Sequence, residues 1–136
     1  MTTAELPTTI RVAASVSYDS AQPGLIVARA QLTNVGTDSV HLTAGGCPLD
    51  LYAYRPTQPL PVWRSDRTKR PCPSIRRAIQ IAPGSQQVLT TSVHRRGVLG
   101  DSLANGVYSL TVRVRLLQPD PRLTLEYPAG QLTLTR

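Results

Sequence analysis

The sequence of 136 residues contains no Phe, and aromatic residues make up only 4% of it. Long apolar runs are missing too, because no stretch approaches the roughly 20 apolar residues that a membrane-spanning helix needs. Hydrophobic residues still make up 40% of the chain, which is enough for one packed core and argues against a disordered chain. That core has to be built from Leu, Val, Ile and Ala, which suit sheets packed face to face.

Sustained helical periodicity is also lacking, and alternation with a period of two recurs instead. We therefore expect seven to nine short strands separated by Gly/Pro turns, at residues 10–18, 25–33, 40–42, 49–54, 62–64, 79–81, 88–94, 108–116 and 123–134, the last as one strand or a bent pair. Residues 97–106 read as a loop and residues 119–121 as a turn. The pattern predicts an all-β, immunoglobulin-like antiparallel sandwich that forms a single domain over residues 1–136.

Acidic residues are few, with eight against fifteen basic ones and a formal net charge of +7. Most of that charge lies between Arg55 and Arg77, a proline-rich connection with Asp66 as its only acid. Its basic residues are Arg55, Arg64, Arg67, Lys69, Arg70, Arg76 and Arg77. A segment with this concentration of positive charge could bind phosphate or uronate groups. The alternative interpretations are that it is a solvated loop and that its many arginines reflect the coding bias of a GC-rich genome.

Only two cysteines are present, Cys47 and Cys72, each followed by proline and with 24 residues between them. An even count in a small β domain favours a disulfide, which would stabilise the fold by roughly 3.5 kcal/mol and implies an oxidising compartment. Two free thiols in a cytosolic protein are the alternative. The first residues have no basic start and no apolar core of a signal peptide, so export would depend on a leader ahead of this sequence.

Catalytic and metal-binding motifs are scarce, since G-x-S-x-G, H-E-x-x-H and C-x-x-C are all absent. His94, Asp101 and Ser102 lie close in sequence and invite comparison with a catalytic triad, but Gly100-Asp101-Ser102 is ordinary turn chemistry. A copper site from His41, Cys47 and His94 lacks the usual clustering of Cys and His on one loop. We expect a protein that is not an enzyme and has no cofactor and no metal.

Several landmarks occur in an informative order: Asn34-x-Gly36, Gly46 with Leu49-Asp50-Leu51, Pro61-Val62-Trp63-Arg64-Ser65, Ile81-Ala82-Pro83-Gly84-Ser85 and Leu103-x-x-Gly106-x-Tyr108-x-Leu110. Together, over roughly residues 25–116, they resemble the immunoglobulin-like domain of the bacterial intracellular proteinase inhibitor family. The resemblance implies that Trp63 packs on the domain and that Gly106 and Tyr108 form something like a tyrosine corner. It also implies protease inhibition or an envelope module, although the cysteine pair and the arginine-rich insertion depart from an intracellular inhibitor.

The expected function is that of a non-catalytic interaction module, located in the periplasm, cell envelope or extracellular space, with the cytoplasm as the alternative. Its partner would be a protein or an anionic envelope polymer, bound by Arg64, Arg67, Lys69, Arg70, Arg76 and Arg77. Specific nucleic-acid binding is not expected, because Trp63 is the only stacking residue near these cations. The alternative function is a proteinase inhibitor that acts on a serine protease.

Overall fold

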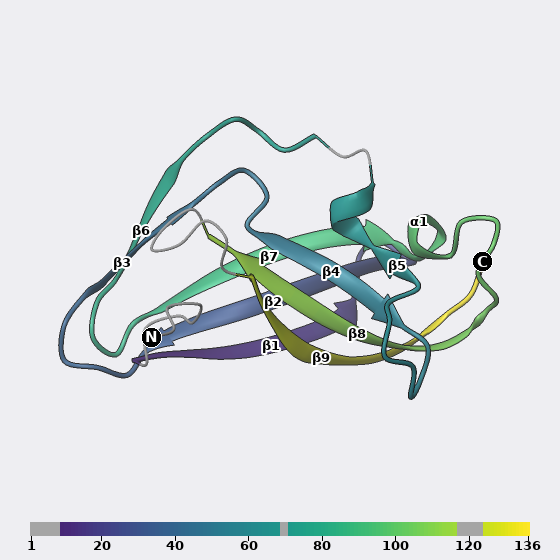
Figure 1. The fold of residues 1–136 in the computed structure, drawn as a ribbon, viewed down its shortest axis with the longest axis horizontal. Coiled ribbons are helices and arrows are strands. Elements are labelled where there is room, and N and C mark those ends of the chain that lie inside the picture. Colours follow the sequence, from purple (N-terminus) through teal and green to yellow (C-terminus); the bar gives the residue numbers. More distant parts are fainter. Residues whose placement is uncertain (1–8, 69–70, 117–123) are drawn as a thin grey trace.

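Strands dominate the computed structural model, which describes residues 9–68, 71–116 and 124–136 (Figure 1). The strands are β1 (Ile10–Tyr18), β2 (Leu25–Asn34), β3 (Val40–Ala44), β4 (Leu49–Tyr54), β5 (Trp63–Arg64), β6 (Arg77–Ile81), β7 (Gln86–His94), β8 (Gly106–Arg115) and β9 (Thr124–Leu134). Two short helical turns accompany them, the 3-10 turn η1 (Ser65–Arg67) and α1 (Arg95–Leu99). The predicted all-β fold is confirmed, and its strands pack as the sheets of an immunoglobulin-like sandwich.

The strands form two main antiparallel sheets, in the orders β1-β2-β7 and β5-β4-β8-β9, and β3 pairs with β6 at one end. Alternation decides which side chains face the core, because successive residues of a strand point to opposite faces. In β2, Ile26, Ala28, Ala30 and Leu32 are fully buried. Leu49 and Leu51 of β4 are buried with them in one aliphatic core, which fits the lack of Phe.

The outer strands are tied across the sandwich. β1 lies beside β9 (Figure 1), and the Tyr18 hydroxyl donates to the carbonyl of Thr133 over 2.6 Å. Strands β5 and β7 are the edges of their sheets on the opposite side. This asymmetry leaves the side with Trp63 less tightly closed than the side with Tyr18.

Two segments differ from the expectation or refine it. Residues 95–99 form the helical turn α1, where the sequence suggested no helix; the His94 Nδ1 accepts the backbone N–H of Arg96 at its start, and Val98 and Leu99 are buried. One turn is too short to show periodicity in the sequence. β9 is a single bent strand whose register against β8 shifts beside Pro128 and Gly130. The turn expected at 119–121 lies outside the described residues.

Candidate functional site

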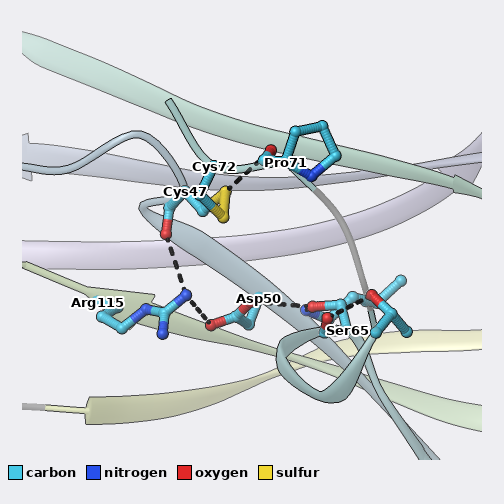
Figure 2. Close-up of a disulfide and its surroundings, with 8 residues drawn as sticks. Cys47, Asp50, Ser65, Pro71, Cys72 and Arg115 are labelled. Atoms are coloured by element: carbon cyan, nitrogen blue, oxygen red, sulfur yellow. Dashed lines mark hydrogen bonds and ion pairs between the residues drawn. A yellow bond between two sulfur atoms is a disulfide. The ribbon is translucent and has the colours of Figure 1, made fainter. Parts of the chain in front are cut away.

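The disulfide between Cys47 and Cys72 joins the β3–β4 loop to the connection that leads to β6 (Figure 2). Their Cα atoms are 5.4 Å apart, and the predicted pairing is confirmed. Gly46, the residue before Cys47, lies against the backbone of Pro73, the residue after Cys72. The two segments are therefore held together by a covalent bond and by close backbone packing.

A buried carboxylate lies beside the disulfide. Asp50 is 2% exposed, accepts a hydrogen bond from the Ser65 hydroxyl over 3.0 Å and pairs with the Arg115 guanidinium at 3.1 Å. The Ser65 hydroxyl accepts the backbone N–H of Leu51 in turn, and Arg115 also reaches the carbonyl of Cys47 (Figure 2). This network fixes the start of η1 and the end of β8 against β4.

Arg64, one of the predicted partner-binding residues, is engaged within the domain. Its guanidinium donates two hydrogen bonds to the carboxylate of Asp66, at 3.0 and 2.9 Å, and lies 4.8 Å from the ring centre of Tyr52. The Tyr52 hydroxyl donates to the same carboxylate over 2.7 Å. The Arg64 hydrogen bonds, opposed by partial burial and aided by Tyr52, lower the pKa of Asp66 to about 2. The only acid of the basic segment is thus already paired.

The same face of the sheet continues into a second group around Glu126. Arg113 lies 4.6 Å from the Tyr52 ring centre and donates to Glu126 over 3.2 Å. The hydroxyls of Thr111 and Tyr54 donate to the other Glu126 oxygen. Burial, followed by the bond to Glu126, raises the pKa of Tyr54 to about 12. On the outer face of the sheet β5-β4-β8-β9, these polar side chains therefore form hydrogen bonds and ion pairs with one another.

The other cations of the segment have a different environment. Arg67 follows Asp66 in η1, Arg76 directly precedes β6, and Arg77 is its first residue. All three are exposed, and none forms an ion pair with the part of the chain that the structure describes. η1, which carries Arg67, and β6, which begins at Arg77, lie apart in the fold (Figure 1).

Three further cations complete the segment. The Arg55 guanidinium lies 5.9 Å from the ring centre of Tyr108, which is within the range of a cation–π contact. Lys69 and Arg70, two predicted partner-binding residues, lie outside the described residues.

The predicted structural residues occupy supporting positions. Trp63 is partly buried and packs against the core. Tyr108 is 1% exposed, and its hydroxyl donates to the carbonyl of Ala104 over 2.5 Å, which is the geometry of a tyrosine corner. Gly106 opens β8 two residues before it. Trp63 and Tyr108 therefore stabilise the packing of the sandwich.

Two residues of the catalytic-triad and copper alternatives are engaged within the fold. His94 uses its Nδ1 to cap α1, and Cys47 has no thiolate to offer a metal because it is oxidised. Within residues 9–68, 71–116 and 124–136, no three His, Cys, Asp or Glu side chains form a group that could hold a metal ion.

Sequence reasoning missed the Tyr52–Arg64–Asp66 cluster and the buried role of Asp50. The spacing Arg64-x-Asp66 is a usable signal, because it places an opposite charge two residues away at a strand end. The register that puts Tyr52 opposite Arg64 is long-range and has no local signature. The sequence alone therefore groups Arg64 with the other predicted partner-binding cations, from which its bonds to Asp66 distinguish it.

The compartment is indicated by the disulfide, since such bonds persist in oxidising surroundings. None of the helices in the described ranges is long or apolar enough to cross a membrane.

No protein-family model matches the chain, and no curated protein is significantly similar to it in sequence. Weak structural similarity is found to a beta-glucosidase from Kluyveromyces marxianus, with 12% identity and a TM-score of 0.42 over 96% of this chain and 16% of that one. Beta-glucosidase 3B from Thermotoga neapolitana gives 13% identity and 0.41 over 98% and 18%, and a beta-glucosidase from Listeria innocua gives 8% and 0.40 over 93% and 17%. The chain spans less than a fifth of each of these proteins, and similarity at this level assigns neither a family nor an activity.

Proposed function

We propose that this domain is a non-catalytic interaction module of a bacterial cell envelope that binds a protein or an anionic surface through the basic segment between Arg55 and Arg77. The observation that supports the proposal is the uneven pairing of charge in that segment. Asp66 is neutralised by Arg64, whereas Arg67, Arg76 and Arg77 stay exposed without a carboxylate among the described residues. Exposed guanidinium groups bind carboxylates and phosphates through two parallel hydrogen bonds.

The test compares two triple variants with the same loss of charge. One replaces Arg67, Arg76 and Arg77 by Ser. The control replaces three other exposed arginines, Arg11, Arg29 and Arg96, by Ser. We expect the first variant to lose binding to a bacterial envelope fraction and to heparin at low salt, and the control to keep most of it. Equal loss in both variants would mean that only net charge matters, which would overturn the role of the segment.

A second candidate function, inhibition of a serine protease in line with the family resemblance, is favoured by the loop between β4 and β5. Leu60 on this loop is 74% exposed, more than any other large apolar side chain of the described chain, and prolines flank it on both sides. Backbone hydrogen bonds from Gln58 to Arg55 and from Val62 to Ala53 fix the ends of the loop. Titration of subtilisin and trypsin with the domain tests this function; cleavage without stoichiometric inhibition would exclude it.

A further inference from the structure

Two hollows adjoin Trp63 at the open edge of the sandwich, where β5 and β7 are the unpaired edges of their sheets within the described chain. The first has a volume of about 260 Å³ and is lined by Leu51, Trp63, Ser65, Thr68, Thr91, Ser92, Val93 and Gly97. The second, of about 230 Å³, is lined by Pro61, Val62, Trp63, Arg64, Arg67 and Thr68. The hollows share Trp63 and Thr68, so a ligand that enters one lies next to the other.

The size and lining of the first hollow limit what it can hold. Pockets for whole small molecules or cofactors generally begin near 300 Å³. At about 260 Å³, the hollow instead suits one large apolar side chain, which Leu51, Trp63 and Val93 would cover.

The second hollow supplies a positive charge. Arg64 and Arg67 both line it, but Arg64 is already bound to Asp66. Arg67 is exposed and has no carboxylate partner among the described residues. A ligand that places an apolar group beside Trp63 would therefore gain most from an acidic group directly next to it.

We propose that the paired hollows at Trp63 bind an apolar–acidic residue pair, such as Leu-Glu, in an extended segment of a partner protein. The apolar side chain enters between Trp63 and Val93, and the carboxylate pairs with Arg67. This inference rests on the proposed function and narrows the partner from a protein or an anionic surface to a segment of a protein.

Trp63 is the only tryptophan of the chain, so its fluorescence reports directly on the hollow. The probe is the capped hexapeptide Gly-Ser-Leu-Glu-Ser-Gly, with two controls in which Leu is replaced by Ser or Glu by Gln. We expect a saturable change in Trp63 emission at peptide concentrations of about 0.1 to 5 mM, the range for one small anchor pair. Both control peptides should bind at least about tenfold more weakly, which is roughly 1.4 kcal/mol.

Two variants locate the charge contact. Arg67→Ser should weaken binding of the Leu-Glu peptide about tenfold, and Arg76→Ser, at another exposed arginine that lines neither hollow, should leave it within about twofold. With the Gln peptide, Arg67→Ser should cause little further loss, because the carboxylate that it pairs with is already gone. Unchanged melting temperatures would confirm that both variants are folded.

The outcomes separate the two proposals. No saturable response, or an equal response to all three peptides, overturns the peptide inference. If the Arg67, Arg76 and Arg77 triple variant still loses envelope binding in that case, the proposed function stands without it. Equal losses in Arg67→Ser and Arg76→Ser would also overturn the inference, because they indicate unspecific attraction. If the peptide binds while the triple variant keeps its envelope binding, the peptide site stands and envelope binding through the basic segment is overturned.

Discussion

The lack of a side chain at Gly46 allows the two cysteine-bearing segments to pack closely together. A Cβ atom at this position would lie 2.1 Å from the carbonyl oxygen of Pro73 and 2.7 Å from its nitrogen, distances that no real contact tolerates. Both atoms belong to backbone, so neither can rotate away. The segments that carry the two cysteines would have to separate, although the disulfide holds them together.

We therefore predict that Gly46→Ala lowers the free energy of unfolding by about 1 to 3 kcal/mol, the usual cost of overpacking. Gly84→Ala is the comparison: Gly84 has a φ of +76° but no atom within 4 Å of an added Cβ, so only the backbone conformation costs energy, about 1 kcal/mol. Urea denaturation of the two variants measures the difference. A smaller loss for Gly46→Ala than for Gly84→Ala would contradict the close packing.

The Tyr108 hydroxyl is a second feature at the residue scale. Its bond to the carbonyl of Ala104 is part-buried and joins β8 to the loop before it. Tyr108→Phe should cost about 1 to 1.5 kcal/mol, because the carbonyl loses its donor. Tyr18→Phe, which removes an exposed hydroxyl bond to Thr133, should cost less. Thermal unfolding of both variants checks the order.

At the scale of elements, the Tyr52–Arg64–Asp66 cluster joins β4, β5 and η1. The bonds from Arg64 keep the pKa of Asp66 at about 2, below its ordinary value of 3.8. Because the folded state lowers this pKa, the carboxylate contributes stability that is complete above about pH 4 and is lost as the pH falls through 2. The cluster should therefore loosen in acid while the core stays intact.

Asp66→Asn is expected to flatten the dependence of the unfolding free energy on pH between about 4 and 2, and to lower stability at pH 7. Asp101→Asn serves as the control, since Asp101 is exposed and has no ion pair with a described residue. Urea denaturation at several pH values gives both curves. Parallel curves for wild type and Asp66→Asn would contradict the role of the cluster.

The strands were predictable from the sequence because alternation is local. Residues 10–18 and 49–54, for instance, are confirmed with unchanged bounds. The α1 turn was not predictable, because one turn has no period to detect. The pairing of Tyr52 with Arg64 was not predictable either, since it depends on the register of strands separated by a long loop.

At the scale of the whole molecule, the disulfide closes a loop of about 26 residues. The double variant Cys47→Ser/Cys72→Ser should lose about 3.5 kcal/mol of unfolding free energy on the chain-entropy estimate. Wild type in a reducing agent should match it, and the variant itself should be insensitive to the reducing agent. A double variant as stable as oxidised wild type would show that the bond contributes nothing.

The site was only partly predictable at this scale. The cysteine pairing followed from the count, since only two cysteines are present. Which arginines lack a carboxylate partner did not follow from the sequence. Asp66 binds Arg64 and not Arg67 because of the local geometry, and a count of charges does not show this.

The compartment can be tested by measuring the intact mass of the protein from its native cells, after alkylation with and without prior reduction. We expect both cysteines of the protein in the envelope fraction to react with the alkylating agent only after reduction. Two thiols that react without reduction would contradict export.

The disulfide also has a mechanical consequence. If the two ends of the chain are pulled apart, Cys47 and Cys72 stay 5.4 Å from each other, and the residues between them hang as a loop that bears no load. At about 3.4 Å per residue, the fully extended oxidised chain is roughly 80 Å shorter than the reduced one. The cluster of Tyr52, Arg64 and Asp66 and the whole lining of the second hollow lie within this loop, whereas half of the lining of the first hollow lies outside it. Stretching the domain would therefore pull on the strands outside the two cysteines and, while the disulfide is intact, apply no tension along the segment between them.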